Sequence, residues 1–127
     1  MILCSGKFDG LHSGHVAYLQ AAASLGEESL LVSVAPDAYI RAASGRNPSW
    51  SQPLRKAAVE ALRCVDVAYE DPEHTPAALI RNEKPRLFVK GVEWAGKLPA
   101  DVVAACREVG CLMVFVDTPG KHTSETR

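Results

Sequence analysis

The sequence predicts an α/β fold built on a mostly parallel sheet of five strands with helices on both faces. Three observations predict it. Five short apolar runs have the length of strands, segments with helical apolar spacing alternate with them, and Gly26 and Gly110 end two of those segments. Strands separated by helices imply right-handed crossovers, which place helices on both faces of the sheet.

Each strand is expected from a short apolar run. The expected strands are residues 2–5, 29–34, 65–69, 86–89 and 111–116. The last run is apolar throughout, so it is expected to be a continuous buried strand.

The helices are expected from apolar residues on one face and from their end signals. The expected helices are residues 16–25, 37–42, 53–64, 76–83 and 99–109. Pro53 and Pro76 suit the first helical position, and Thr75 is a good N-cap. Residues 43–52, rich in Gly, Pro, Asn and Ser, are expected to form a loop of a length that is often functional.

Length and charge limit the possible classes. The 127 residues are enough for one domain, expected to span 1–127, and too few for two ordinary ones. A formal net charge of −1 gives no electrostatic footprint for nucleic acid or an anionic membrane. No window approaches the ~18 apolar residues of a membrane span, and the amino terminus has no signal-peptide pattern, so the default expectation is a cytoplasmic protein.

The four cysteines indicate buried free thiols rather than a metal site. They lie at positions 4, 64, 106 and 111, with no C-x-x-C pair and no nearby histidine. Cys106 and Cys111 could approach each other across a helix end, but a structural disulfide is unusual in a reducing compartment. We therefore predict no metal site.

The segment from Gly6 to His15 is the strongest functional signal in the chain. It places His12 and His15 around Gly14, directly after the first strand and before a helix. A glycine lets a ligand approach the free N–H groups of a helix start, where the helix dipole favours negative charge. The pattern favours a phosphate site over two alternatives, histidines that only order the loop and a zinc site, for which no third ligand is evident.

Three clusters of polar residues follow strands of the expected sheet. Lys7 to His15 follow the first strand, Lys90 and Gly91 follow the fourth, and Thr123 to Arg127 follow the fifth. In open α/β sheets, ligands lie beyond the carboxyl ends of the strands where the strand order reverses. The three clusters are therefore expected to meet at one crevice.

An ordered set of motifs resembles the cytidylyltransferase-like nucleotidyltransferases. The set comprises the residues 6–9, the H-x-G-H signature, Tyr18-Leu19, Leu25-Gly26, Val65-Asp66, Thr75-Pro76, Leu79-Ile80 and Val89-Lys90-Gly91. The stretch from 75 to 91 is most similar to the adenylyltransferase domain that makes ADP-heptose. The resemblance implies a Rossmann-like sheet of order 3-2-1-4-5 and transfer of a nucleotidyl group from ATP or CTP to a phosphorylated sugar or polyol.

The resemblance also implies roles for individual residues. His12 and His15 would stabilise charge on the α-phosphate and the departing pyrophosphate, and Lys90 would bridge the phosphates of acceptor and nucleotide. Nucleotide-binding residues would be Gly6, Phe8, Asp9, Gly14, Gly91, Thr123, Ser124 and Arg127. Lys7, at a position that is commonly uncharged in the family, is a further candidate for the nucleotide. Asp9, Lys90 and Trp94 would bind the acceptor, and Mg²⁺ would accompany the nucleotide.

Blander alternatives stay open for several of these residues. Asp9 could be a turn residue, Phe8 is more typical of a core, and a lone lysine at position 90 would usually be solvated. The terminal residues could be a disordered tail.

The chain also departs from the family pattern. Ser44 stands where close relatives usually carry a lysine, so Lys7, Arg46 or Arg55 would have to supply the charge. The departure leaves a second hypothesis, a catalytically weakened nucleotide-binding regulator. A third, a flavodoxin-like or stress-protein-like domain, applies only if the histidine motif is accidental. A homodimer is plausible by family likeness.

Overall fold

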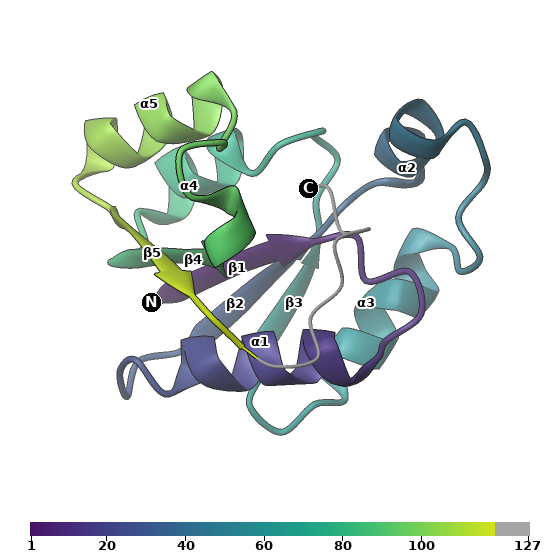
Figure 1. Ribbon diagram of the computed structural model, residues 1–127, viewed down its shortest axis with the longest axis horizontal. Coiled ribbons are helices and arrows are strands. Elements are labelled where there is room, and N and C mark those ends of the chain that lie inside the picture. Colours follow the sequence, from purple (N-terminus) through teal and green to yellow (C-terminus); the bar gives the residue numbers. More distant parts are fainter. Residues whose placement is uncertain (119–127) are drawn as a thin grey trace.

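The sheet has the strand order that the resemblance implies. The computed structural model describes residues 1–118, and its five strands pair in parallel in the order β3-β2-β1-β4-β5 (Figure 1). The strands are β1 (Ile2–Gly6), β2 (Leu30–Val34), β3 (Val67–Glu70), β4 (Leu87–Gly91) and β5 (Leu112–Val116). The predicted fold class and strand order are confirmed.

The helices form a layer on each face of this sheet. They are α1 (Ser13–Ala23), α2 (Asp37–Ser44), α3 (Gln52–Glu60), α4 (Ala77–Glu83) and α5 (Ala100–Val109), with a 3₁₀ turn η1 (Val92–Trp94) after β4. In Figure 1, α1 and α3 lie on one side of the sheet, and α4 and α5 lie on the other. The two buried clusters agree, because one joins the sheet to α1 and α3 and the other joins it to α4 and α5.

The alternating side chains of β1 supply both halves of the core. Ile2 and Cys4 belong to the cluster under α1 and α3, whereas Leu3 belongs to the cluster under α4 and α5. This strand is buried along its whole length because it lies in the middle of the sheet. The chain leaves β1 toward β2 on one side and returns to β4 on the other, so the strand order reverses between β1 and β4. Ligands of open α/β sheets bind at this position.

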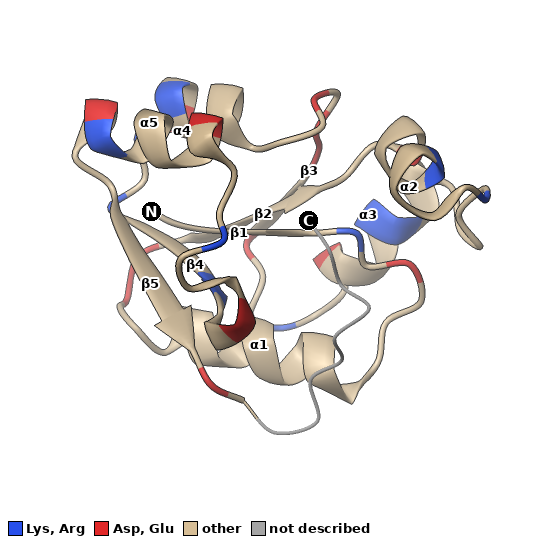
Figure 2. Ribbon diagram, turned by 45° about the horizontal axis from the view of Figure 1, so that its top comes forward, with Lys and Arg blue, Asp and Glu red and all other residues tan. Residues whose placement is uncertain are grey.

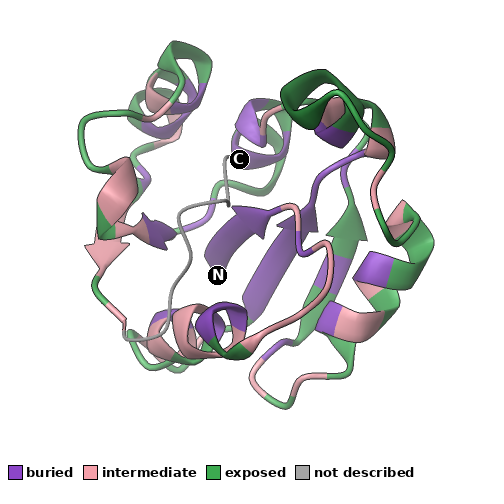
Figure 3. Ribbon diagram, turned by 45° about the vertical axis from the view of Figure 1, so that its right-hand side comes forward, coloured by how far each residue is buried: buried purple, intermediate pink, exposed green. Residues whose placement is uncertain are grey.

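The prediction of a continuous buried strand at residues 111–116 is wrong in its burial. Leu112 is 62% exposed, and the rest of β5 is only half-buried. The cause is its position, because β5 pairs with β4 alone and forms an edge of the sheet. Figure 3 shows the contrast between the buried central strands and β5.

Other differences are shifts of boundaries. α1 begins at Ser13 rather than at Val16, because His12 caps it, and α4 begins at Ala77 after the Pro76 cap position. Of the four free cysteines, Cys64 is half-buried and the other three are buried, close to the prediction.

The described part of the chain shows two further global features. Basic and acidic residues are interspersed around the ribbon (Figure 2), in keeping with a formal net charge of −1. Across residues 1–118, the helices are too short and too polar for any of them to cross a bilayer.

Candidate active site

The two histidines build the start of α1. His12 is the N-cap, and its Nδ1 accepts a hydrogen bond from the Gly14 N–H at 3.1 Å. The Nδ1 of His15 accepts from the N–H of His12 at 3.3 Å, and the two rings stack with centroids 3.7 Å apart. An imidazole nitrogen that accepts a hydrogen bond carries no proton, so in each neutral ring the proton is on Nε2. Both rings therefore offer an Nε2 donor, which a phosphate oxygen requires.

Phe8 supports this pair from the loop that follows β1. Its backbone φ is +53°, a conformation that residues other than glycine rarely adopt. Residues in such conformations cluster at functional loops. Its side chain is 1% exposed, and its ring centroid lies 5.2 Å from that of His15. Phe8 is thus a core residue that packs against one catalytic candidate.

Lys90 lies at the end of β4 and is 2% exposed. Its Nζ donates to the carbonyl oxygen of Ser5 at 2.9 Å and lies 4.8 Å from the centre of the Trp94 ring. A solvated lysine at this position is therefore ruled out. The reason is that β4 is an inner strand here, and the 3₁₀ turn that follows folds Trp94 over the ammonium group.

Tyr18 links α1 to the two central strands. Its hydroxyl donates to the carbonyl of Val89 and accepts from the N–H of Ser5 at 3.4 Å. Lys90 Nζ lies 6.0 Å from the centre of the same ring. The tyrosine thereby fixes the first turns of α1 relative to the ends of β1 and β4.

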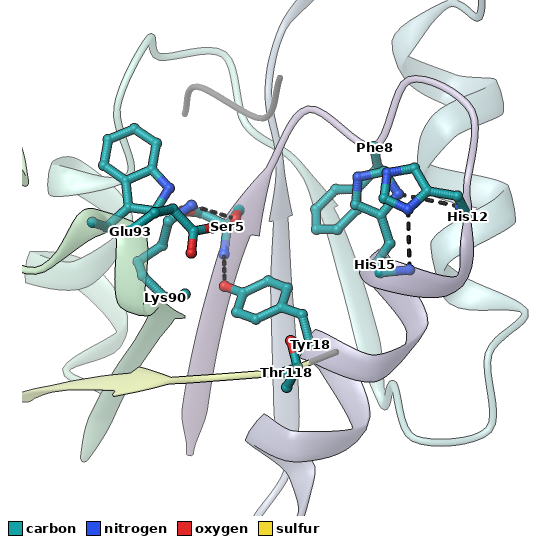
Figure 4. A pocket seen from close by; sticks show the side chains of 11 residues that line it. Ser5, Phe8, His12, His15, Tyr18, Lys90, Glu93 and Thr118 are labelled. Carbon is teal, nitrogen blue, oxygen red and sulfur yellow. Dashed lines mark hydrogen bonds between the residues drawn. The ribbon is translucent and has the colours of Figure 1, made fainter. Parts of the chain in front are cut away.

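These residues surround one cavity at the carboxyl ends of β1 and β4. It holds about 450 Å³ including its open mouth, and Gly14 and Gly91 lie in its wall. Figure 4 shows His12 and His15 on one side, Lys90 and Glu93 on the other, and Tyr18 between them. The structure therefore brings the two histidines and the lysine to a common space, as the motif positions predict.

A second cavity adjoins the first on the side of α2. His12 and His15 line both, and the second also has Lys7, Arg46 and Ser44 in its wall. It holds about 830 Å³ including its open mouth. The imidazoles thus stand between two spaces, one with a buried ammonium group and one with two cationic side chains.

Comparison with known proteins decides the family. The model of the cytidylyltransferase-like family matches residues 3–125. The chain belongs to the cytidylyltransferase-like family.

The curated relatives are longer proteins. The chain is 39% identical over 127 residues to the bifunctional protein HldE of Campylobacter fetus, covering 98% of this chain and 26% of that protein. It is 34% identical over 126 residues to the bifunctional protein HldE of Nitrosococcus oceani, again covering 98% of this chain and 26% of the relative. The chain thus spans about a quarter of the length of these relatives.

A solved structure agrees with the family. The lipopolysaccharide core biosynthesis protein from Thermoplasma volcanium superposes with a TM-score of 0.77 at 28% identity, over 92% of this chain and 95% of that one. The predicted family is confirmed, and family membership supports the predicted enzyme class, a nucleotidyltransferase. The hypothesis of an accidental histidine motif on a flavodoxin-like domain is therefore wrong.

Asp9 has the role of a loop residue in this family member. Its two carboxylate oxygens accept hydrogen bonds from the backbone N–H groups of Ser49 and Trp50, at 2.8 and 2.9 Å. The contact ties the loop after β1 to the loop before α3. Asp9 therefore shapes the second cavity, whose wall it shares with Ser49.

Arg55 is a structural residue rather than a substitute phosphate ligand. It is fully buried, and its guanidinium donates to three carbonyl oxygens at 2.7 to 2.9 Å, those of Lys7, Ala35 and Trp50. It also pairs with Asp37 at 2.6 Å. A guanidinium with this many partners joins the loops after β1 and β2 to the loop before α3.

Ser44 does not stand in for a lysine. Its hydroxyl donates to the carbonyl of Ile40 at 2.8 Å and accepts from the N–H of Arg46 at 3.2 Å, so it closes the end of α2. Among the compensating cations suggested by the sequence, Lys7 and Arg46 reach the second cavity and Arg55 does not. The cationic side chains in the wall of the second cavity are therefore those of Lys7 and Arg46.

The remaining site predictions divide into two groups. Gly6 ends β1 and accepts a hydrogen bond from Ala35 through its carbonyl, without lining either cavity. Thr123, Ser124 and Arg127 lie outside the described residues, so their roles stay predictions.

Sequence reasoning gave no role to three residues that matter for the first cavity. Tyr18 lies one helical turn after His15 and thus on the same face of α1, a spacing that could have identified it. Glu93 lies between Gly91 and Trp94 in the motif after β4 and also lines the cavity. Ser5 is the last but one residue of β1, and its apolar context gave no signal.

Proposed function

We propose that the chain transfers a nucleotidyl group from ATP or CTP to a small phosphorylated sugar or polyol and releases pyrophosphate. One observation carries the proposal: His12, His15 and Lys90 line a single cavity at the carboxyl ends of β1 and β4. Three cationic or donor groups around one space suit a site where several phosphates meet. Family membership supports the same reaction class.

The reaction needs positioning and charge stabilisation rather than an enzyme nucleophile. An oxygen of the acceptor's phosphate bonds to the α-phosphorus while the bond from that phosphorus to the bridging oxygen breaks. Pyrophosphate leaves with the electron pair of the broken bond. The Nε2 donors of His12 and His15 would stabilise the charge that grows on the α-phosphate and the leaving group, and Lys90 would hold the acceptor's phosphate against it.

The second cavity would take the leaving part of the nucleotide. Its wall combines Lys7 and Arg46 with the two histidines, which border both spaces. A triphosphate could then run from the first cavity past the imidazoles to these cations. Thr123, Ser124 and Arg127 are further nucleotide ligands in this proposal.

Magnesium would enter with the nucleotide. Mg²⁺ prefers phosphate oxygens and water, with one or two carboxylates at most. Each carboxylate oxygen of Asp9 already accepts one backbone N–H group, so Asp9 would bind Mg²⁺ only through its remaining lone pairs. Bound Mg²⁺ would supply further charge neutralisation on the phosphates, with Glu93 as the acidic side chain in the wall of the first cavity.

ATP and a sugar phosphate are the favoured pair. The preference rests on the resemblance of residues 75–94 to the adenylyltransferase domain that makes ADP-heptose. The solved relative is described as a lipopolysaccharide core biosynthesis protein, a process built on sugars, which supports the same choice of acceptor class.

Pyrophosphate release tests the proposal. The chain is incubated with ATP or CTP, Mg²⁺ and a panel of phosphorylated aldoses and polyols of three to seven carbons. We expect acceptor-dependent pyrophosphate with at least one pair and a loss of at least about 100-fold in Lys90→Met. Nucleotide binding without turnover for every pair would indicate the regulator instead.

A further inference from the structure

The pairing of β1 with β4 stops before either strand ends. In the described chain their last pair is Cys4↔Val89. Beyond it, β1 remains paired with β2 up to Gly6, and β4 remains paired with β5 up to Gly91. The two central strands are thus not paired with each other at their carboxyl ends, where residues of both strands line the first cavity.

One side chain bonds to both strands where their pairing stops. The hydroxyl of Tyr18 donates to the carbonyl oxygen of Val89 on β4 and accepts from the N–H of Ser5 on β1, the latter at 3.4 Å. Tyr18 belongs to α1, so it reaches the strands from the face of the sheet that α1 covers. Its hydroxyl therefore closes the last rung of the ladder beside the first cavity, which Tyr18 also lines.

A second side chain reaches the same point from the opposite face. Side chains alternate along a strand, and Phe88 packs in the cluster under α4 and α5, so Lys90 leaves β4 on that face. Its Nζ donates to the carbonyl oxygen of Ser5 at 2.9 Å. If the parallel ladder continued in the same register, the N–H of Gly91 would bond to this carbonyl. The ammonium group thus takes the acceptor of the next backbone hydrogen bond.

The backbone of Ser5 is held from both faces of the sheet. Tyr18 bonds to its N–H, and Lys90 bonds to its carbonyl (Figure 4). Ser5 and Lys90 are both buried, so water does not readily replace either partner. The four-carbon stem of a lysine is flexible and does not fix its own ammonium group. The position of Lys90 Nζ therefore depends on where Tyr18 holds the end of β1.

We propose that Tyr18 is a positioning residue for nucleotidyl transfer. Its hydroxyl ends the ladder between β1 and β4 and fixes Ser5, whose carbonyl orients Lys90 in the first cavity. The proposal rests on the proposed function, in which Lys90 holds the acceptor's phosphate. The proton of the Tyr18 hydroxyl is donated to Val89, so Tyr18 acts through Lys90 and not as a donor to the substrate.

Tyr18→Phe removes the hydroxyl and keeps the ring. Misplacing a reacting group by about 1 Å can cost about 100-fold in rate, and the retained ring limits the displacement, so we expect kcat/KM for the acceptor to fall about tenfold. The nucleotide KM should stay unchanged, whereas a general disturbance of the structure would raise it as well. Tyr69→Phe is the matched control and should change neither constant, because Tyr69 is 40% exposed on the edge strand β3 and lines neither cavity.

A double-mutant cycle with Lys90→Met tests whether Tyr18 acts through Lys90. Adding Tyr18→Phe to Lys90→Met should cost much less than the loss that Tyr18→Phe causes in wild type, because coupled residues are not additive. Losses that simply multiply would overturn the proposal. Unchanged acceptor constants in Tyr18→Phe would overturn it too.

Chemical labelling reports the position of Lys90 without any substrate. Native protein is treated with acetic anhydride, and mass spectrometry of its peptides gives a rate for each lysine. We expect Lys90 to react several-fold faster in Tyr18→Phe than in wild type, while half-buried Lys56 and exposed Lys84 keep their rates. An unchanged rate at Lys90, or an equal rise at all three lysines, would contradict the positioning role.

The labelling also separates this proposal from the proposed function. A chain that released no pyrophosphate but whose Lys90 became more reactive in Tyr18→Phe would contradict the transfer reaction and support the positioning of Lys90 by Tyr18. Turnover with an unchanged labelling rate at Lys90 would support the reaction and contradict the positioning role. Absence of both effects would contradict both.

Discussion

Each imidazole of the H-x-G-H motif does two things at the residue scale. The Nδ1 atoms of His12 and His15 accept backbone N–H groups and so form the cap of α1, which leaves the proton of each neutral ring on Nε2. Ordering the loop and binding phosphate are therefore compatible roles rather than alternatives. The cap fixes the tautomer that phosphate binding needs.

Substituting His12 separates the two roles. Asparagine is a good N-cap, so His12→Asn should keep the hydrogen bond to the Gly14 N–H and change the free energy of unfolding by less than about 1 kcal/mol. It lacks the Nε2 donor and should lower kcat by about 100-fold or more. His12→Ala should lose both the cap hydrogen bond and the Nε2 donor, so it should lower both the free energy of unfolding and kcat. Pyrophosphate assays and urea unfolding measure the two effects, and full turnover in His12→Asn would show that His12 is only a cap.

Lys7 is a candidate for the positive charge that binds the nucleotide's phosphates in the second cavity. Its side chain lines the second cavity with Arg46, while Ser44 is engaged in closing α2. Lys7→Ala should therefore raise the nucleotide KM several-fold while the acceptor KM changes little. Steady-state kinetics with varied nucleotide measure it. Unchanged nucleotide KM and kcat would show that Lys7 does not compensate for the missing family lysine.

At the scale of elements, one buried side chain joins three loops around the second cavity. The burial of Arg55 could not be predicted from the sequence pattern, because an arginine in an amphipathic helix is expected on the solvent side. Its burial follows from the tertiary structure, where the carbonyls of Lys7, Ala35 and Trp50 converge on one point. The sequence suggested a role in phosphate binding, and the structure assigns the side chain to loop geometry instead.

Arg55→Met should be strongly destabilising. It removes the donor of three backbone carbonyls and the charged partner of Asp37, whose side chain is 32% exposed. A buried group left without its hydrogen bond costs about 1–3 kcal/mol, so we expect a total loss of about 2–4 kcal/mol. Urea unfolding measures the change. The control is Arg63→Met, at an exposed arginine after α3, which should alter the free energy of unfolding by less than about 0.5 kcal/mol. Equal effects of the two substitutions would contradict this account of Arg55.

A second contact between elements predicts a pH dependence. The guanidinium of Arg86, just before β4, donates to both oxygens of Glu28, just before β2, at 2.7 and 2.8 Å. These hydrogen bonds lower the pKa of Glu28 from 4.5 to about 2. A lowered carboxyl pKa stabilises the fold fully above the unfolded pKa, and the contribution is lost as the pH falls toward the folded pKa.

Glu28→Gln should therefore be less stable than wild type at pH 7, with the difference shrinking as the pH falls from 4.5 to 2. Urea unfolding at several pH values gives the comparison. A difference that stays constant over this range would show that the ionised carboxylate is not the cause.

The elements themselves were largely predictable. All five strands and five helices were located from apolar runs, prolines and glycines, since these signals act locally. Burial of β5 was mispredicted because an apolar run is the same in an edge strand and in a central one. The start of α1 was missed because a histidine is not a usual N-cap.

At the scale of the whole molecule, the site follows from the topology. The motifs after β1 and β4 could be predicted to meet because carboxyl ends of parallel strands share one edge, and the cavity around His15 and Lys90 bears this out. The burial of Lys90 could not be predicted. It depends on how side chains from distant segments pack, which no local pattern encodes. The expected homodimer and the single domain over 1–127 stay predictions.

Phosphorus-31 NMR of a single reaction tests the central claim most directly. The chain is mixed with ATP, Mg²⁺ and a sugar phosphate that gives turnover in the pyrophosphate assay, and the phosphorus signals are followed with time. We predict two new coupled signals from a diphosphate in which the α-phosphorus is joined to the acceptor's phosphate. The molar amount of this product should equal the molar amount of inorganic pyrophosphate. Release of AMP with pyrophosphate, and an acceptor signal that stays unchanged, would contradict transfer at the cavity of His12, His15 and Lys90.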